Sequence, residues 1–439
     1  MRRAIYAALR IVGAWDRRLR DRLTPAGWLV LGAAGAAAAA GIDTNLTVTY
    51  RAFAFLAALF VLSWVASSLF RCSIEASRDM ARYATAGEPF NYRIAVLNRG
   101  SRRLAGVRIG EQFADPRPTY QEWRLAREPG EEHRNWFDRK VGYFRWRWLI
   151  ERRVPRDPRA GELEALAPGE RATLRLEFTP RRRGRIEMRG LTVGKTDPLG
   201  LVRGLVRVEL QRGLIALPKR YRLPEMALPG KRRFQPGGVS LAASAGDSEE
   251  FLSLRDYRPG DPLQRLHWKS YARTGKPIVK EYQDEFFERH ALVLDTGSPQ
   301  GEDAAFEDAV ALAASFVYTI DTQDCLLDLL FIGGDVRAYT AGRGQMQAEH
   351  LLEALAGVNP SEPQGFRLLA SAVLARRGAL SSVIAVFMHW DEERARFVAA
   401  LRSVGFTVRA MLVREAPAGT DGVLHLVPGR IAQGLAGLR

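Results

Sequence analysis

The sequence predicts a multidomain α+β protein that consists of a hairpin of two apolar helices, a β-sandwich and a doubly wound α/β domain. Three observations predict this order. Two uncharged apolar runs occupy residues 26–42 and 52–70, residues 71–220 alternate apolar and polar side chains, and residues 290–439 alternate apolar strands with helices. Because 439 residues amount to about two or three typical domains, the chain is long enough for more than one hydrophobic core.

The composition is that of a folded, basic protein. Hydrophobic residues make up 47% and charged residues 26% of the chain, which excludes a disordered protein. The net charge of +16 favours anionic partners such as lipid head groups, nucleic acid or an acidic protein surface, although a coding bias towards Ala, Arg and Gly explains it equally well. Cys72 and Cys325 lie far apart without metal-ligand spacing, so the sequence signals neither a disulfide framework nor a zinc site, which suits a reducing cytoplasm.

The apolar runs predict a transmembrane helical hairpin over residues 26–70. Each run approaches the roughly 20 residues that cross a bilayer core, and the loop between them, residues 43–51, is too short for a domain. The first run is rich in Ala and Gly and drives insertion weakly, but small residues allow two membrane helices to pack closely. A cleaved signal peptide is the rival interpretation, and it fits poorly because a second full-length run follows at once.

Arginines flank both ends of this hairpin. They are Arg10, Arg17, Arg18, Arg20 and Arg22 before the first run and Arg71, Arg78 and Arg82 after the second. Because basic flanks stay in the cytoplasm, we expect a two-pass membrane protein with lipid contacts and both termini on the cytoplasmic side. Residues 1–25 then form a basic cytoplasmic segment. This segment is either an interfacial helix with Ile5, Leu9, Val12 and Leu19 on its apolar face or a short tail.

Residues 71–220 predict a β-sandwich of immunoglobulin-like character. Short runs such as 91–98 and 173–178 alternate apolar and polar side chains, and Gly, Pro and Asn separate such runs. Residues 115–160 interrupt the pattern with tryptophans among many arginines. This insertion either packs on the sandwich or lies on lipid head groups. It carries no nucleic-acid-binding signature, so no nucleic acid is expected as a partner.

Residues 221–289 contain a linker and the most specific passage of the chain. This passage, residues 249–282, is called the central motif. Pro259 and Gly260 predict a type II turn, since Pro fixes φ and Gly accepts a positive φ. Asp261 follows the turn and is a suitable cap for a predicted helix over residues 262–274, because its side chain can accept free backbone N–H groups.

A basic stripe is predicted on this helix. Its members recur at a spacing of four and are Arg265, Lys269 and Arg273. Trp268 lies beside the stripe, and His267 lies on another face. One interpretation is a docking surface for carboxylates or phosphates. The other is an intramolecular clamp, in which Asp256, Glu249 and Glu250 pair with these cations and join two domains.

Several residues of the central motif match one known pattern. They are Arg255, Tyr257, Pro259, Gly260, Asp261, Arg265, His267, Trp268, Lys269 and Arg273, with Asp256 inside the same segment. This pattern resembles the hallmark of the bacterial "domain of unknown function 58" family, and the resemblance extends to residues 182–185, to residues 197–201 and to the apolar hairpin. It implies an inner-membrane accessory partner of a MoxR-type AAA ATPase in the assembly or activation of a client protein. It implies no catalytic residue.

Residues 290–439 predict a doubly wound parallel sheet. Near-continuous apolar runs such as 291–295 and 382–388 alternate with helical segments, which is typical of strands buried on both faces. Ligand sites of such sheets lie beyond the carboxyl ends of the strands, where Asp295 and Asp391 fall.

This part also resembles a von Willebrand factor A domain, whose metal site uses an Asp-x-Ser-x-Ser loop after the first strand. Here Gly297 and Pro299 replace both serines and remove two hydroxyl ligands. One interpretation is an altered divalent-metal site whose oxygen ligands are Asp295, Thr296, Ser298 and Asp391. The other is that Asp295 caps or shapes a loop.

The sequence contains no GxxxxGK(S/T) phosphate loop and no GxSxG or HExxH motif. His389 fits a structural role better than a hydrolytic set with Ser298 and Asp391. The leading hypothesis is therefore a non-enzymatic interaction protein that couples a membrane anchor to an ATPase or client, with no cofactor required. The alternative is a metal-dependent adhesion or hydrolase module that uses Asp295 and Asp391.

Overall fold

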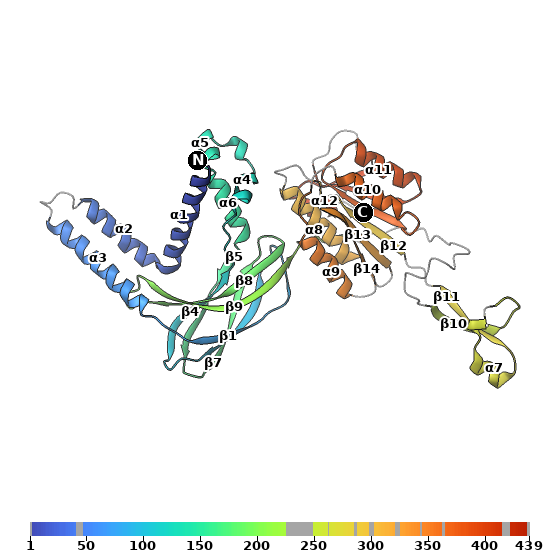
Figure 1. Cartoon of the computed structure of the whole chain (residues 1–439), viewed down its shortest axis with the longest axis horizontal. Helices are drawn as coiled ribbons and strands as arrows, with labels where there is room; N and C mark the ends of the chain where they lie inside the picture. The colour runs from blue at the N-terminus through green and yellow to red at the C-terminus, as the bar shows by residue number, and fades with distance from the viewer. Residues whose placement is uncertain are drawn as a thin grey trace. The chain divides into compact units, whose positions relative to one another are not determined.

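The computed structural model describes residues 2–40, 47–224, 249–261, 263–284, 288–297, 303–320, 325–342, 345–361, 365–414 and 422–436. The chain is of mixed α/β class, as predicted, and its described strands form four sheets. Contacts between Cα atoms divide it into two compact units (Figure 1). Unit 1 comprises Met1–Tyr221, Pro299–Ala314 and Leu352–Asn359, and unit 2 comprises Arg222–Ser298, Ser315–Leu351 and Pro360–Arg439.

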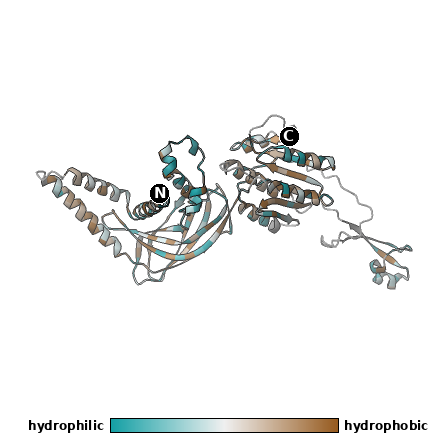
Figure 2. Ribbon diagram, turned by 45° about the horizontal axis from the view of Figure 1, so that its top comes forward, coloured by the Kyte–Doolittle hydropathy of each residue, from teal (hydrophilic) through white to brown (hydrophobic). Residues whose placement is uncertain are grey.

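Three helices open the chain in unit 1: α1 (Arg2–Arg22), α2 (Pro25–Ala40) and α3 (Thr47–Ser68). α2 and α3 pack side by side, and Figure 2 shows apolar residues along much of both helices. Among the described helices, only the Val48–Ser68 part of α3 is long and apolar enough to cross a membrane. α2 has 16 residues, about 24 Å of helix, and is therefore shorter than a typical span. The two-pass hairpin remains a prediction.

Two β-sheets follow and enclose one hydrophobic core. The first has the order β1-β3-β7-β5, with β1 (Ile74–Asp79), β3 (Phe90–Asn98), β7 (Arg171–Thr179) and β5 (Arg156–Arg159). The second has the order β2-β9-β8-β4-β6, with β2 (Tyr83–Thr85), β9 (Arg203–Leu217), β8 (Gly184–Thr196), β4 (Leu104–Phe113) and β6 (Gly161–Leu166). Ile94 of β3 and Leu191 of β8 are fully buried in this shared core. The alternation in the sequence therefore marks strands with one buried face, while the immunoglobulin-like topology remains a prediction.

The segment predicted as an insertion contains short helices. They are α4 (Tyr120–Leu125), the 3-10 turn η1 (Glu131–His133), α5 (Trp136–Val141) and α6 (Tyr143–Arg153). Thr119 and Glu122 form a capping box at the start of α4, and Gly142 ends α5 with a φ of +64°. Trp123 and Trp146 are buried in a small core that includes apolar residues of α1. The insertion thus packs against α1.

Unit 2 contains a six-stranded sheet in the order β14-β13-β12-β15-β16-β17. The strands are β12 (Glu288–Leu294), β13 (Cys325–Gly333), β14 (Asp335–Ala341), β15 (Ser382–Phe387), β16 (Thr407–Leu412) and β17 (Val423–His425). Neighbouring strands are parallel, as the apolar runs predicted, except that β14 is antiparallel to β13.

The C-terminal part also contains five helices among its described residues. They are α8 (Asp303–Thr319), α9 (Gln345–Ala356), α10 (Phe366–Ala375), α11 (Glu392–Ser403) and α12 (Ile431–Ala436). α10 and α11 share one hydrophobic core with the sheet, in which Phe387 of β15 and Phe397 of α11 are buried. The likeness to a von Willebrand factor A domain remains a prediction.

The central motif forms a second, two-stranded sheet in unit 2, made of β10 (Glu249–Asp256) and β11 (Ile278–Asp284). Between them lie the 3-10 turn η3 (Leu263–Arg265) and the helix α7 (Trp268–Thr274), and residues 249–284 are called the motif hairpin. The predicted continuous helix over this segment is interrupted. Leu266 pairs with Val279 of β11, and the His267 N–H donates to the Ile278 carbonyl at 2.8 Å, so the backbone leaves the helix there.

Candidate functional site

A bidentate ion pair fixes the tip of the motif hairpin. Arg255 donates from Nη1 and Nη2 to the two carboxylate oxygens of Asp261, at 2.7 and 2.8 Å. Asp261 also accepts from the Arg258 N–H at 2.8 Å, while its own N–H donates to the Arg258 carbonyl at 3.0 Å. Gly260 has a φ of +109°, so the predicted turn is confirmed. The Arg255 guanidinium lowers the pKa of Asp261 to about 2, and Asp261 braces the turn instead of capping a helix.

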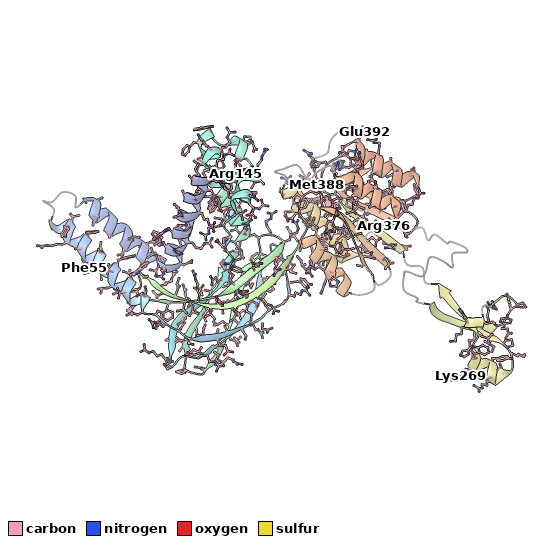
Figure 3. All side chains as sticks on the ribbon, in the orientation of Figure 1. Phe55, Arg145, Lys269, Arg376, Met388 and Glu392 are labelled. Atoms are coloured by element: carbon pink, nitrogen blue, oxygen red, sulfur yellow. The ribbon has the colours of Figure 1, made fainter. Side chains whose placement is uncertain are left out.

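α7 presents aromatic and basic side chains to solvent. Trp268 and Tyr271 are 63% and 42% exposed, and their rings meet edge to face with centroids 6.2 Å apart. Lys269 and Arg273 are exposed as well, and Figure 3 shows the Lys269 side chain on α7. These four residues are called the α7 surface. They combine apolar area with positive charge on one short helix.

The other residues of the helical segment support the hairpin from inside. Leu266 and Val279 are 8% and 2% exposed and are the buried apolar residues among the hairpin's described side chains. His267 Nδ1 lies 2.6 Å from Ser270 Oγ, which ties the first turn of α7 together. The side chain of Arg265 lies outside the described residues, so the predicted stripe is described only for its other two members.

Contacts of Asp256 bear on the clamp interpretation. Asp256 is exposed, and within the described part of the hairpin no ion pair joins it to Lys269 or Arg273. Tyr257 is half-buried and donates its N–H to the Pro277 carbonyl at 3.0 Å. The side chains of the other two acidic residues predicted for the clamp, at positions 249 and 250, are not among those described.

A second candidate site lies at the carboxyl ends of β12 and β15. Arg394 of α11 donates from Nε to Asp295 at 2.7 Å and from Nη1 to Asp391 at 2.5 Å. Asp391 also accepts the Arg394 N–H at 2.9 Å and caps α11. Asp295, Asp391 and Arg394 are called the arginine–carboxylate cluster.

Burial sets the electrostatics of this cluster. Asp295 and Arg394 are only 1% and 2% exposed. Burial raises the pKa of Asp295, and the hydrogen bond from Arg394 acts against that rise. Burial acts to lower the pKa of Arg394, but the two carboxylates outweigh it and raise that pKa. The guanidinium also lies 4.6 Å from the centre of the Phe366 ring, so this cation is enclosed on several sides.

The sheet topology explains why the two carboxylates meet. β13 lies on one side of β12 and β15 on the other, so the order of the strands reverses at β12. Asp295 directly follows β12, and Asp391 follows β15. The crevice at such a switch point is the usual ligand position in α/β sheets. Arg394 was not predicted from the sequence. The signal that could have identified it is its position three residues after Asp391, a suitable helix cap.

Two further metal ligands were predicted, Thr296 and Ser298. Thr296 Oγ1 donates to the Ile332 carbonyl at 3.0 Å and lies 2.9 Å from Ser361 Oγ. Ser298 is not among the described residues. Over the described ranges, no group of three or more His, Cys, Asp or Glu side chains could hold a metal ion.

A comparison with known families matches part of the C-terminal half. A family model described as "Protein of unknown function DUF58" matches residues 253–427. The uncharacterized protein YeaD of Bacillus subtilis (strain 168) is 27% identical over 186 residues, which is 42% of this chain and 45% of that protein. The chain thus spans less than half the length of this curated relative.

Solved structures add little. The alkylpurine DNA glycosylase AlkC of Pseudomonas fluorescens, bound to DNA with an abasic site analog, matches 40% of this chain and 41% of its own at 10% identity and a TM-score of 0.18. PapD-like domain 7 of human CEP192 matches 33% of this chain and 84% of its own at 13% identity and a TM-score of 0.15. At such low TM-scores neither likeness supports an argument.

The family match includes both candidate sites, because α7 and the arginine–carboxylate cluster lie within residues 253–427. It agrees with the resemblance that the central motif suggested. Residues 253–427 of the chain thus match the DUF58 family of proteins of unknown function, which supports that resemblance.

Proposed function

We propose that the chain is a non-enzymatic interaction protein, anchored in the bacterial inner membrane, that docks a partner through the α7 surface. The observation that carries this proposal is the exposure of Trp268 beside Lys269 and Arg273. Tryptophan and arginine are enriched among the residues that dominate protein interfaces. The positive charge favours a partner with carboxylates at the contact.

The construction of the hairpin supports this role. Among its described side chains, Leu266 and Val279 are buried, and its tip is fixed by the pair between Arg255 and Asp261. Neither feature uses the side chains of the α7 surface. A rigid support that leaves its outer side chains unused lowers the entropy lost on binding, which is what a preorganised docking element requires.

The proposed partner is a MoxR-type AAA ATPase, together with a client protein whose identity is open. The resemblance of the central motif suggests this class of ATPase. The chain itself has no phosphate-binding loop, so ATP hydrolysis is assigned to the partner.

The anchor of the proposed protein is α3 with α2 beside it. α3 has the length and composition of a membrane-spanning helix, and α2 adds a shorter apolar helix rich in small residues. Arginines before α2 and after α3 favour cytoplasmic positions for both ends of the pair. This orientation gives a cytoplasmic partner access to the α7 surface.

The rival function is a metal-dependent adhesion or hydrolase module at Asp295 and Asp391. Their position at the switch point of the sheet favours it. The buried guanidinium of Arg394 opposes it, because both carboxylates already bind this cation and a metal ion would have to displace it. We therefore assign the cluster a structural role.

The test is co-purification from membranes that contain the full chain. Lys269→Glu combined with Arg273→Glu should reduce the recovered ATPase about tenfold or more, because the charge reversal repels an acidic contact surface. The matched control, Arg102→Glu with Arg103→Glu, makes the same charge change at exposed positions between β3 and β4. An unchanged partner set with a folded α7 variant would contradict docking and favour the clamp.

A further inference from the structure

The turn between α1 and α2 is a fixed corner. Thr24 donates from Oγ1 to the Gly200 carbonyl at 2.6 Å, and its N–H donates to the Leu201 carbonyl at 3.1 Å. The same hydroxyl accepts the Gly27 N–H at 3.0 Å and so caps α2. Gly27 itself lies so close that a Cβ there would stand 2.2 Å from the Leu201 oxygen. α2 therefore starts directly against the turn that joins β8 and β9.

That turn is itself rigid. Asp197 accepts the N–H groups of Leu199, Leu201 and Val202 at 2.9, 2.8 and 2.7 Å. Burial acts to raise the pKa of Asp197, but these N–H donors outweigh it and hold the pKa below its usual value. Val202 pairs in turn with Leu23 between the two helices. Residues 197–201, which the sequence singled out, thus support the corner.

The corner sets the direction of α1. Figure 1 shows α1 running at a steep angle to α2 and α3, with α4 and α6 on one side of it and the apolar pair extending from the other. All these elements belong to unit 1. If α2 and α3 run through a bilayer, α1 therefore runs along its surface.

α1 has two distinct faces. The inner face carries Ile5, Tyr6 and Leu9, which pack on the buried Trp123 and Trp146. Tyr6 also donates its hydroxyl to the carbonyl of residue 118 at 3.1 Å. The insertion thus covers the inner face of α1, and these contacts hold α1 in place.

The outer face is apolar and exposed. Ile11, Val12 and Trp15 are 60%, 65% and 61% exposed, and Ala8 shares their side of the helix at the spacing of residues 8, 11, 12 and 15. Arg18 is exposed at one edge of this face, three residues after Trp15, and Arg10 is exposed further round the helix. An apolar face with a tryptophan and an arginine at its edge is typical of a helix that lies in the head-group layer of a membrane.

We infer that α1 is an interfacial helix whose outer face binds an anionic lipid surface. Ile11, Val12 and Trp15 enter the boundary between head groups and acyl chains, and the exposed Arg18 and Arg10 reach lipid phosphates. The bilayer is the occupant because the face is continuous, through the fixed corner, with the apolar α2 and α3. This inference rests on the proposed membrane anchor.

The experiment places fluorescent labels on the full chain in vesicles of phosphatidylglycerol and phosphatidylcholine. Cys72→Ser and Cys325→Ala remove the native thiols, and Val12→Cys, Phe55→Cys or Ser101→Cys adds a single labelling position. Phe55 extends from α3 (Figure 3) and reports the anchor, whereas Ser101 lies exposed after β3 and serves as the control. Lipids with a quencher at a shallow or a deep acyl position then measure contact with the bilayer.

The expected result is strong shallow quenching at Val12, strong deep quenching at Phe55 and little at Ser101. In vesicles of phosphatidylcholine alone, quenching at Val12 should fall severalfold, because the arginines lose their anionic partners. Quenching at Phe55 without quenching at Val12 would overturn the inference and leave the anchor intact. Absence of quenching at both Val12 and Phe55 would overturn the anchor as well. Equal quenching at Val12 in vesicles with and without phosphatidylglycerol would contradict the preference for anionic lipid.

Discussion

The motif hairpin and the arginine–carboxylate cluster both depend on an Arg–Asp pair, but they differ in what the pair does. In the hairpin, the side chains of Arg255 and Asp261 are 35% and 16% exposed and brace a turn of the element that also carries the exposed aromatic residues of α7. In the cluster, the pair of Arg394 and Asp295 is almost completely buried. The same kind of ion pair thus supports an exposed surface in the hairpin. In the cluster it joins α11 to the loop at the carboxyl end of β12. We therefore expect binding effects at the hairpin and stability effects at the cluster.

The largest effect is expected from Arg394→Met. The variant leaves the buried Asp295 without its counter-charge, so the free energy of unfolding of the α/β domain should fall by about 3–5 kcal/mol. Urea unfolding of the full chain in detergent, with hydrogen exchange followed in β12 and α11, measures this loss. Arg396→Met is the matched control at an exposed position and should change stability by less than about 0.5 kcal/mol. Unchanged stability of Arg394→Met would remove the structural role of the cluster.

The next effect is on binding. Trp268→Ala should weaken partner affinity by about 2 kcal/mol, or about 30-fold, because an exposed tryptophan on a rigid element is the expected centre of the interface. Binding of the purified full chain to the ATPase identified by co-purification measures it, with the melting temperature as the control for folding. A large drop in stability with unchanged affinity would assign Trp268 to the folding of the hairpin.

A smaller effect concerns pH. The folded pKa of Asp261 is about 2, below the ordinary 3.8, so its ionised form stabilises the hairpin above pH 3.8 and this contribution is lost as pH falls through about 2. Carbon-13 NMR of labelled aspartate should show this low pKa, and Arg255→Met should return it towards 3.8. An ordinary pKa in the unmodified chain would contradict the ion pair at the tip.

The smallest effect is expected at Asp256. Asp256→Asn should change stability by less than about 0.5 kcal/mol and leave hydrogen exchange in α7 unchanged, because Asp256 is exposed. Faster hydrogen exchange throughout α7 would support the clamp interpretation. It would also contradict the expectation that changes in the hairpin affect binding and not stability.

Local chemistry made part of the hairpin predictable. Pro259 and Gly260 determine the backbone of their turn by themselves, and the turn is where the sequence predicted it. The helix after it was predicted as continuous, yet the pairing of Leu266 with Val279 interrupts it. That pairing joins residues on different elements, so it cannot be predicted from helical spacing in the sequence.

The same limit applies to the α/β domain. Its parallel strands were predicted because strands buried on both faces leave near-continuous apolar runs in the sequence. β14 was missed, since most of its side chains are exposed and give no such run. Arg394 was missed because its burial depends on Asp295, 99 positions away in the chain.

The most direct test of the central claim is site-specific photo-crosslinking in membranes, with a benzophenone amino acid replacing Trp268 or, as the control, Arg102. If the α7 surface docks a partner, the label at position 268 should join the chain to an AAA ATPase, and the label at position 102 should not. Crosslinks from position 268 only to other parts of the same chain, or identical products from both positions, would contradict the docking account.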